Sequence, residues 1–210
     1  GKLIAEYPTP DGVDLEVGGT VEDQGDAFGD LGVLFILIVI LVYIVMATQF
    51  ESLLFPFIIM FTIPFAFTGV FLALWMTSTP LSLIALIGAI MLVGIVTKNG
   101  IVMVDYMNLL IERGSGVFDA VIAGGKSRLR PVLMTSFTTI LGMLPLAIGT
   151  GAGSETWQPM GIAVIGGLTF STILTLFIVP VLYSILVNRS QRKEREKLAR
   201  LAAEHQASVH

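Results

Sequence analysis

The sequence contains no cysteine, and its two histidines, His205 and His210, both fall at the C-terminal end. Without thiols the chain has no disulfide, no thiolate metal ligand and no nucleophilic cysteine. It also lacks a Gly-rich phosphate loop followed by lysine, a paired-acid metal motif and a Ser-His arrangement. We therefore predict no metal, no cofactor, no nucleic-acid partner and no enzymatic activity.

Charge is also scarce, since charged residues make up 13% of the chain against 54% hydrophobic residues, and the mean hydropathy is +0.86. A water-soluble core does not absorb this much apolar surface. A membrane-spanning helix needs about 20 predominantly apolar residues. The fold class predicted is an all-α integral membrane protein with five transmembrane helices, near residues 31–49, 53–76, 81–107, 131–149 and 159–187.

Basic residues are confined almost entirely to two places, and these orient the spans. One group lies between the third and fourth predicted spans, and the other lies in the tail, 188–210. The loops at the opposite ends, around 77–80 and 149–158, contain no basic residue. Because cytoplasmic loops are enriched in Lys and Arg, we expect a charged cytoplasmic tail and an N-terminal segment on the outer side.

The first 30 residues hold half of the 16 acidic residues and a single basic one, Lys2. The alternating run 13–17, stopped by two glycines, predicts a short strand, and Thr20 with Asp23 predicts a helix start. One strand cannot form a sheet, so we interpret residues 1–30 as the remnant and linker of a larger extracytoplasmic domain. A disordered polar leader is the alternative. The chain starts with Gly rather than Met, from which we expect a fragment.

Between the third and fourth spans, apolar residues repeat at helical spacing and a glycine pair follows at 124–125. This pattern predicts a separate amphipathic helix, about 116–125, on the cytoplasmic membrane surface. Pro131 is expected at the first turn of the fourth span, where a missing N–H costs little. Three further prolines are expected to kink span interiors: Pro64, Pro145 and Pro180.

Lys98 is the one basic residue inside a predicted span. A lysine at the centre of a membrane helix costs roughly 2.5–3.5 kcal/mol and is usually functional or partnered. Asp105 lies on the same face, but two turns separate the pair by about 10.5 Å along the axis. The partner of Lys98 is therefore expected elsewhere, and Asp105 is either a supporting residue or a wetted interfacial carboxylate. Asn99 adds an amide on a different part of the helix circumference.

The fourth span carries hydroxyls on one face, at Thr135, Thr138 and Thr139. Such a stripe either lets helices approach closely and hydrogen-bond or, if it faces Lys98, forms a polar patch suited to proton or ion movement. The last span has a comparable face in Thr172 and Thr175. The supporting polar residues that we predict for such a patch are Asn99, Asp105, Ser136, Thr138 and Thr139.

Three segments carry a resemblance to a known family: GIVTKNGIVMVDY at 94–106, RLRPVLMTS at 128–136 and GTGAGS at 149–154. QFES at 49–52 fits as well. Together they resemble the resistance-nodulation-division (RND) efflux pumps. The resemblance covers essentially the whole chain, as the last five of twelve spans plus the final strand and linker of a periplasmic porter domain.

This resemblance implies a proton-driven antiporter of the bacterial inner membrane, a homotrimer working with a periplasmic adaptor and an outer-membrane channel. It implies that Lys98 is the relay cation, Thr135 its hydroxyl partner and Arg128 an auxiliary residue at the cytoplasmic entrance. The acidic pair that Lys98 contacts would belong to the N-terminal half of the same pump. Lys98 in its motif resembles the hydrophobe and drug exporters more than the heavy-metal exporters. A truncated, non-transporting membrane scaffold and an export or lipid-handling relative of the superfamily stay open as alternatives.

Overall fold

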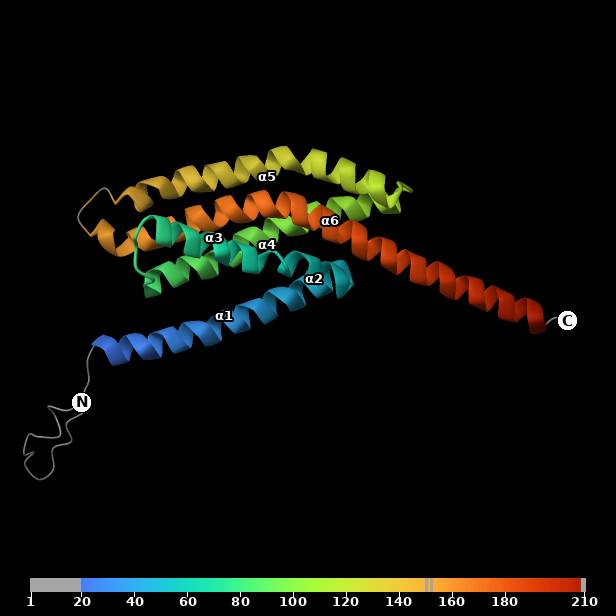
Figure 1. Ribbon diagram of the computed structural model, residues 1–210, viewed down its shortest axis with the longest axis horizontal. Coiled ribbons are helices and arrows are strands. Elements are labelled where there is room, and N and C mark those ends of the chain that lie inside the picture. Colours follow the sequence, from blue (N-terminus) through green and yellow to red (C-terminus); the bar gives the residue numbers. More distant parts are fainter. Residues whose placement is uncertain (1–19, 150, 152, 209–210) are drawn as a thin grey trace, which may run out of the picture.

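The computed structural model describes residues 20–149, 151 and 153–208, and it is helical almost throughout. Five stretches are long and apolar enough to span a membrane, which confirms the predicted all-α membrane class. The predicted strand at 13–17 lies outside the described residues. The helices (Figure 1) are α1 (Thr20–Phe50), α2 (Leu54–Met60), α3 (Ile63–Met76), α4 (Leu83–Glu112), α5 (Val117–Ile148) and α6 (Ser154–Ser208).

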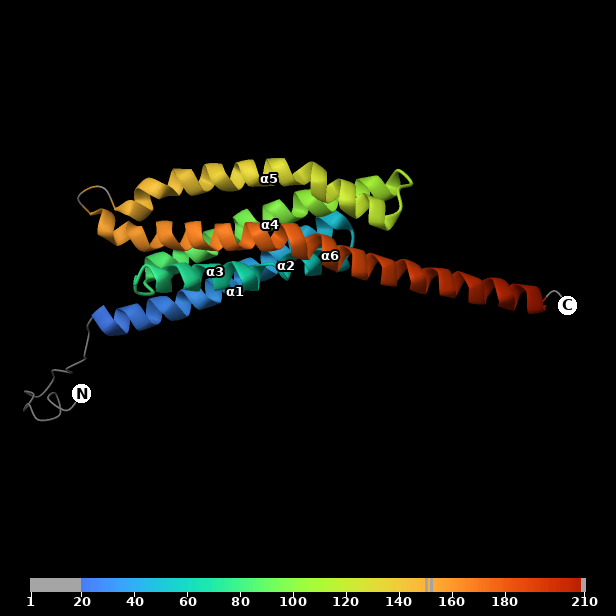
Figure 2. The same cartoon turned by 45° about the horizontal axis from the view of Figure 1, so that its top comes forward.

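Helix α6 is the central element of the bundle, because it packs against α3, α4 and α5. Figures 1 and 2 both show α5 along one edge and α1 along the other, with α6 continuing as a long helix beyond the bundle. Helix α1 contacts only α2 and α4 to a substantial extent. The outer surfaces of α1 and α5 are therefore mostly exposed apolar side chains.

Glycines allow α6 to approach α3 closely. A Cβ atom added to Gly166 would lie 2.1 Å from the Ala73 Cβ, and one added to Gly69 would lie 2.5 Å from the Phe170 Cβ. Real Cβ atoms do not approach this closely, so the two helices are in backbone-level contact, as small residues permit in membranes. The glycine pair Gly166-Gly167 of α6 lies at this contact.

The second predicted span is broken rather than kinked. Phe61 and Thr62 lie between α2 and α3, so Pro64 stands in the first turn of α3 and not in a helix interior. Proline has no N–H, which removes the helical donor for the carbonyl of Met60. The Thr62 hydroxyl, which is buried at the break, donates to the carbonyl of Ile59 at 2.6 Å, and the Thr62 backbone N–H donates to the same carbonyl at 3.0 Å. Pro145 and Pro180 lie inside continuous helices, as predicted.

The prediction of a separate helix at about 116–125 was wrong, because α5 runs without interruption from Val117 to Ile148. Gly124 does not end a helix: it is buried, and an added Cβ would lie 2.6 Å from the Cγ of Met107 on α4. Pro131 is correspondingly interior to α5 rather than at its start. The close contact between α4 and α5 leaves no room for a side chain at Gly124. The local sequence does not distinguish a glycine at a helix contact from a glycine that ends a helix.

We predict that Gly166→Ala lowers the free energy of unfolding by about 1–3 kcal/mol, because the new methyl group overpacks the α3–α6 contact. The control is Gly142→Ala, since nothing lies within 4 Å of a Cβ at that helical glycine. Thermal unfolding in detergent measures both. Equal melting temperatures for the two variants would contradict the close α3–α6 packing.

Candidate functional site

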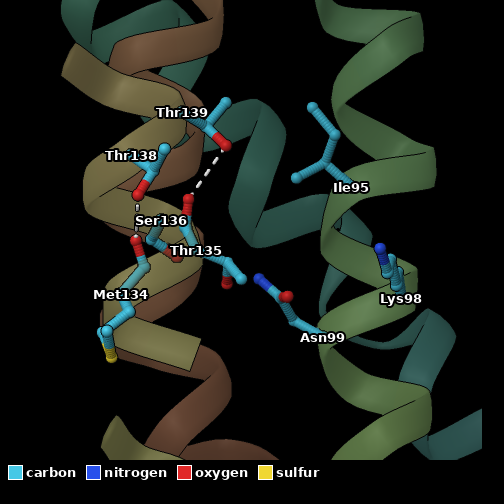
Figure 3. Close-up of a pocket in the computed structure, with 8 residues that line it drawn as sticks. All are labelled: Ile95, Lys98, Asn99, Met134, Thr135, Ser136, Thr138 and Thr139. Atoms are coloured by element: carbon cyan, nitrogen blue, oxygen red, sulfur yellow. Dashed lines mark hydrogen bonds between the residues drawn. The ribbon is translucent and has the colours of Figure 1, made fainter. Parts of the chain in front are cut away.

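A cavity of about 400 Å³ opens between α4 and α5. It brings Lys98 of α4 together with the hydroxyl stripe of α5, which are far apart in sequence (Figure 3). We call this the Lys98 pocket; its lining consists of Ile95, Lys98, Asn99, Met134, Thr135, Ser136, Thr138 and Thr139. Five of the predicted site residues beside Lys98 itself thus line one cavity: Asn99, Thr135, Ser136, Thr138 and Thr139.

Asn99, rather than Lys98, reaches across the pocket. Figure 3 shows the Asn99 amide directed toward Thr135, whereas the Lys98 side chain lies along the far side of α4. Lys98 is exposed, and Asn99 is half-buried. The two side chains lie on different parts of the helix circumference, as predicted. The sequence did not show that the Asn99 amide would be the one directed toward Thr135.

The threonine hydroxyls of the pocket donate hydrogen bonds to backbone carbonyls of their own helix, α5. Thr135 donates to the carbonyl of Val132 (3.0 Å), Thr138 donates to that of Met134 (2.8 Å), and Thr139 donates to that of Thr135 (2.9 Å). A hydroxyl that donates in this way keeps lone pairs free to accept. The α5 face of the pocket therefore offers acceptors, which suit an ammonium or an amide N–H.

Ser136 differs from these threonines because it bonds to another helix. Its hydroxyl lies 2.9 Å from the Thr172 hydroxyl of α6, and both side chains are buried. Ser136 also lines the Lys98 pocket. This single residue connects the pocket wall to the central helix.

Arg128 lies outside the pocket, two turns before Thr135 on α5. Its guanidinium carbon lies 4.6 Å from the ring centroid of Tyr106 on α4, within the range of a cation–π contact. The Arg128 Nε is buried without a hydrogen-bond partner in the described part of the chain. Asp105 is exposed and does not line the pocket. The α4–α5 pair thus has two polar levels, one at Lys98 and one at Arg128.

Sequence reasoning missed Tyr106 and the Ser136–Thr172 bond. An aromatic residue near a helix end is ordinary in membrane proteins, so Tyr106 carried no signal of its contact with Arg128. Ser136 and Thr172 were each visible as hydroxyls, but only the α5–α6 packing pairs them.

The lining combines one cation with neutral acceptors and contains no carboxylate. No cluster of three or more His, Cys, Asp or Glu side chains able to hold a metal occurs among the described residues. A lysine in a low-dielectric setting attracts any carboxylate that approaches it far more strongly than in water. The arrangement can therefore bind an anionic group presented from outside this chain and respond to its protonation.

Comparison with known proteins gives a consistent result. The sequence profile described as the AcrB/AcrD/AcrF family matches residues 2–187. The chain is 38% identical over 193 residues to the swarming motility protein SwrC of Bacillus subtilis, covering 91% of this chain and 18% of that protein. It is also 38% identical over 192 residues to the cobalt-zinc-cadmium resistance protein CzcA of Cupriavidus metallidurans, with the same coverage.

A multidrug resistance protein, MdtC of Erwinia amylovora, is 44% identical over 155 residues, which cover 73% of this chain and 15% of that protein. Among solved structures, the crystal structure of a heavy metal efflux pump matches with a TM-score of 0.72 and 30% identity, covering 89% of this chain and 18% of that one. The chain thus spans less than a fifth of the length of these relatives.

The Ser136–Thr172 bond yields a stability prediction. Ser136→Ala should lower the free energy of unfolding by about 0.5–2 kcal/mol, because it leaves the buried Thr172 hydroxyl without its partner. Adding Thr172→Val should restore part of that loss, since it removes the unpaired group. Thermal unfolding of the single and double variants measures the coupling.

Thr169→Val is the control for that cycle. Its hydroxyl is exposed on the same helix and donates to its own backbone at 2.7 Å. It should show no coupling to Ser136→Ala. Strictly additive effects of Ser136→Ala and Thr172→Val would count against the bond.

Proposed function

Because the chain belongs to the AcrB/AcrD/AcrF family of RND efflux transporters, we propose that it is the C-terminal membrane half of a proton-driven pump for drugs or other amphiphilic compounds. The observation that carries this proposal is the Lys98 pocket, a cavity whose lining contains one intramembrane cation and several hydroxyl acceptors but no carboxylate. Intramembrane ionisable residues mark proton and ion pathways more often than structural sites.

In the proposed mechanism an acidic pair from the N-terminal half faces Lys98. While that pair is ionised, it attracts the ammonium group. When protons arrive from outside the membrane, the attraction weakens and Lys98 turns toward other acceptors. The resemblance to the RND pumps points to the Thr135 hydroxyl as the first of these. A local change of charge becomes a displacement of α4 relative to α5.

Arg128 is assigned to the cytoplasmic side of the same relay. It stands two turns from Thr135 and against the ring of Tyr106. A guanidinium stays charged at every physiological pH. It can therefore attract anionic groups and water to this end of the α4–α5 interface without itself carrying the proton.

The proposed assembly follows from the resemblance: a homotrimer in the bacterial inner membrane, with a periplasmic adaptor and an outer-membrane channel. The exposed apolar surfaces of α1 and α5 support a site for further helices or lipid. We assign residues 1–30 to the periplasmic porter domain and its linker, 31–187 to the membrane domain, and 188–210 to the cytoplasm.

Metal-cation export is the second candidate function. It is favoured by the names of two matches, a cobalt-zinc-cadmium resistance protein and a heavy metal efflux pump. The drug assignment is favoured by the Lys98 motif, which resembles that of the drug exporters, and by the multidrug relative. Export assays with a dye and with radioactive zinc in the complete transporter distinguish the two.

We expect Lys98→Ala in the complete transporter to reduce export to background without reducing membrane insertion, because the relay loses its cation. Lys126→Ala is the matched control, since Lys126 is an exposed lysine on the cytoplasmic part of α5. Dye efflux and the amount of protein in the membrane are measured together. Undiminished efflux with Lys98→Ala would refute the proposed function.

The proposed orientation has its own test. The chain has no cysteine, so single cysteines at Glu155 and Arg189, both exposed, can be labelled in intact cells with a membrane-impermeant maleimide. Only the cysteine at 155 should react before the cells are opened. Reaction of both positions from the same side would exclude this topology.

A further inference from the structure

The buried polar side chains of the described residues are all hydroxyls, and they lie at one level of the bundle. On α4, Thr97 follows the last residue of one apolar cluster, Val96, and precedes the first fully buried residue of the other, Met103. On α6 the gap between the two clusters is likewise filled by hydroxyls. We call this set the hydroxyl layer: Thr62, Thr97, Ser136, Ser171, Thr172 and Thr175.

Most of the hydroxyl layer is satisfied by the protein itself. Three of its members donate to carbonyls of their own helices or turns: Thr62 at 2.6 Å, Thr97 at 2.6 Å and Ser171 at 3.2 Å. Ser136 and Thr172 bond to each other. Only Thr175 is without a hydrogen-bond partner in the described residues, although its side chain is just 1% exposed.

Two O–H protons of the hydroxyl layer have no acceptor in the described residues. A hydroxyl pair uses one of its two protons, so the Ser136–Thr172 pair keeps one O–H uncommitted, and Thr175 keeps another. Thr172 and Thr175 are three residues apart on α6 and so lie on the same helix face. An unsatisfied buried hydroxyl is costly, and native proteins usually supply a partner.

We propose that Thr175, Ser136 and Thr172 hold a buried water site that opens into the Lys98 pocket through Ser136. A water molecule accepts two hydrogen bonds and donates two, which matches the uncommitted protons and lone pairs of these hydroxyls. A side chain of another polypeptide cannot reach Thr175, because this chain already encloses it. Ser136 belongs both to the pocket wall and to the buried pair, so the route inward starts at the pocket.

On the proposed function, this water site extends the proton path from the Lys98 pocket into the interior face of α6. Hydroxyls and water can relay a proton along hydrogen bonds, so its charge moves by exchange of O–H bonds and no ionisable side chain is needed in the core. The consequence is that α6, which packs against α3, α4 and α5, is connected to the pocket by hydrogen bonds as well as by packing.

Isotope exchange of a buried thiol tests for water directly. In a transporter otherwise free of cysteine, Thr175→Cys places a thiol at the site, and Val179→Cys places one in the apolar cluster one turn further on, where the side chain is 0% exposed. Infrared spectroscopy follows S–H to S–D exchange in deuterated water. We expect the thiol of Thr175→Cys to exchange at least about tenfold faster, because water reaches it without local unfolding. Equal exchange rates overturn the proposal.

The role in proton movement has a separate readout. Thr175→Val keeps the shape but removes the hydroxyl, and we expect it to lower the export rate about tenfold and to change its pH profile. Thr175→Ser should retain export, and Thr169→Val, on the exposed face, should leave it unchanged. A higher melting temperature for Thr175→Val with unchanged export would show that the buried hydroxyl takes no part in transport, and would overturn its proposed role in proton movement.

Lys98→Ala in the same assay separates the two proposals. Loss of export with Lys98→Ala but not with Thr175→Val would refute only the proposed proton path through the buried water. Retention of export with Lys98→Ala removes the proposed relay itself.

Discussion

Polar groups inside a membrane must find partners within the protein, because hydrocarbon offers none. Lys98 is the strongest instance in this chain, and the structure around it follows from that constraint. Its pocket is lined by an amide and by hydroxyls whose protons are committed to the α5 backbone. The broken second span obeys the same rule, since the buried Thr62 hydroxyl at the break donates to the carbonyl of Ile59.

Packing divides the bundle into a fixed side and an open side. Backbone-level contact at Gly166 and Gly69 joins α6 to α3, and large side chains would not fit there. The α4–α5 interface has a close contact at Gly124, near the loop that joins the two helices, and then opens into the Lys98 pocket. Close-packed interfaces resist continuous deformation. The displacement that we propose at Lys98 would therefore be accommodated most easily between α4 and α5.

Sequence alone predicted the elements whose signal is local and strong. Long apolar runs gave the spans, and an isolated lysine beside hydroxyls predicted the composition of the pocket. Most of the failures involve contacts between helices. Gly124 was interpreted as a helix stop because its neighbour, Met107 on α4, is invisible in the local pattern. Pro64 was placed in a helix interior because span length does not reveal a break, and Tyr106 gave no sign of its contact with Arg128.

The position of Asn99 adds a step to the proposed relay that the resemblance does not contain. Its amide points toward Thr135 while the Lys98 side chain lies away from α5 (Figure 3). In this position the Asn99 amide, and not the Lys98 ammonium, faces the α5 hydroxyls, so Lys98 would have to displace the amide to reach them. While an external carboxylate pair holds Lys98, the amide can occupy the α5 hydroxyls. Once that pair is protonated, the ammonium needs those oxygens more than the amide does, because a charged donor forms the stronger hydrogen bond. Exchange of one donor for the other would then shift α4 against α5, at the interface that contains the Lys98 pocket.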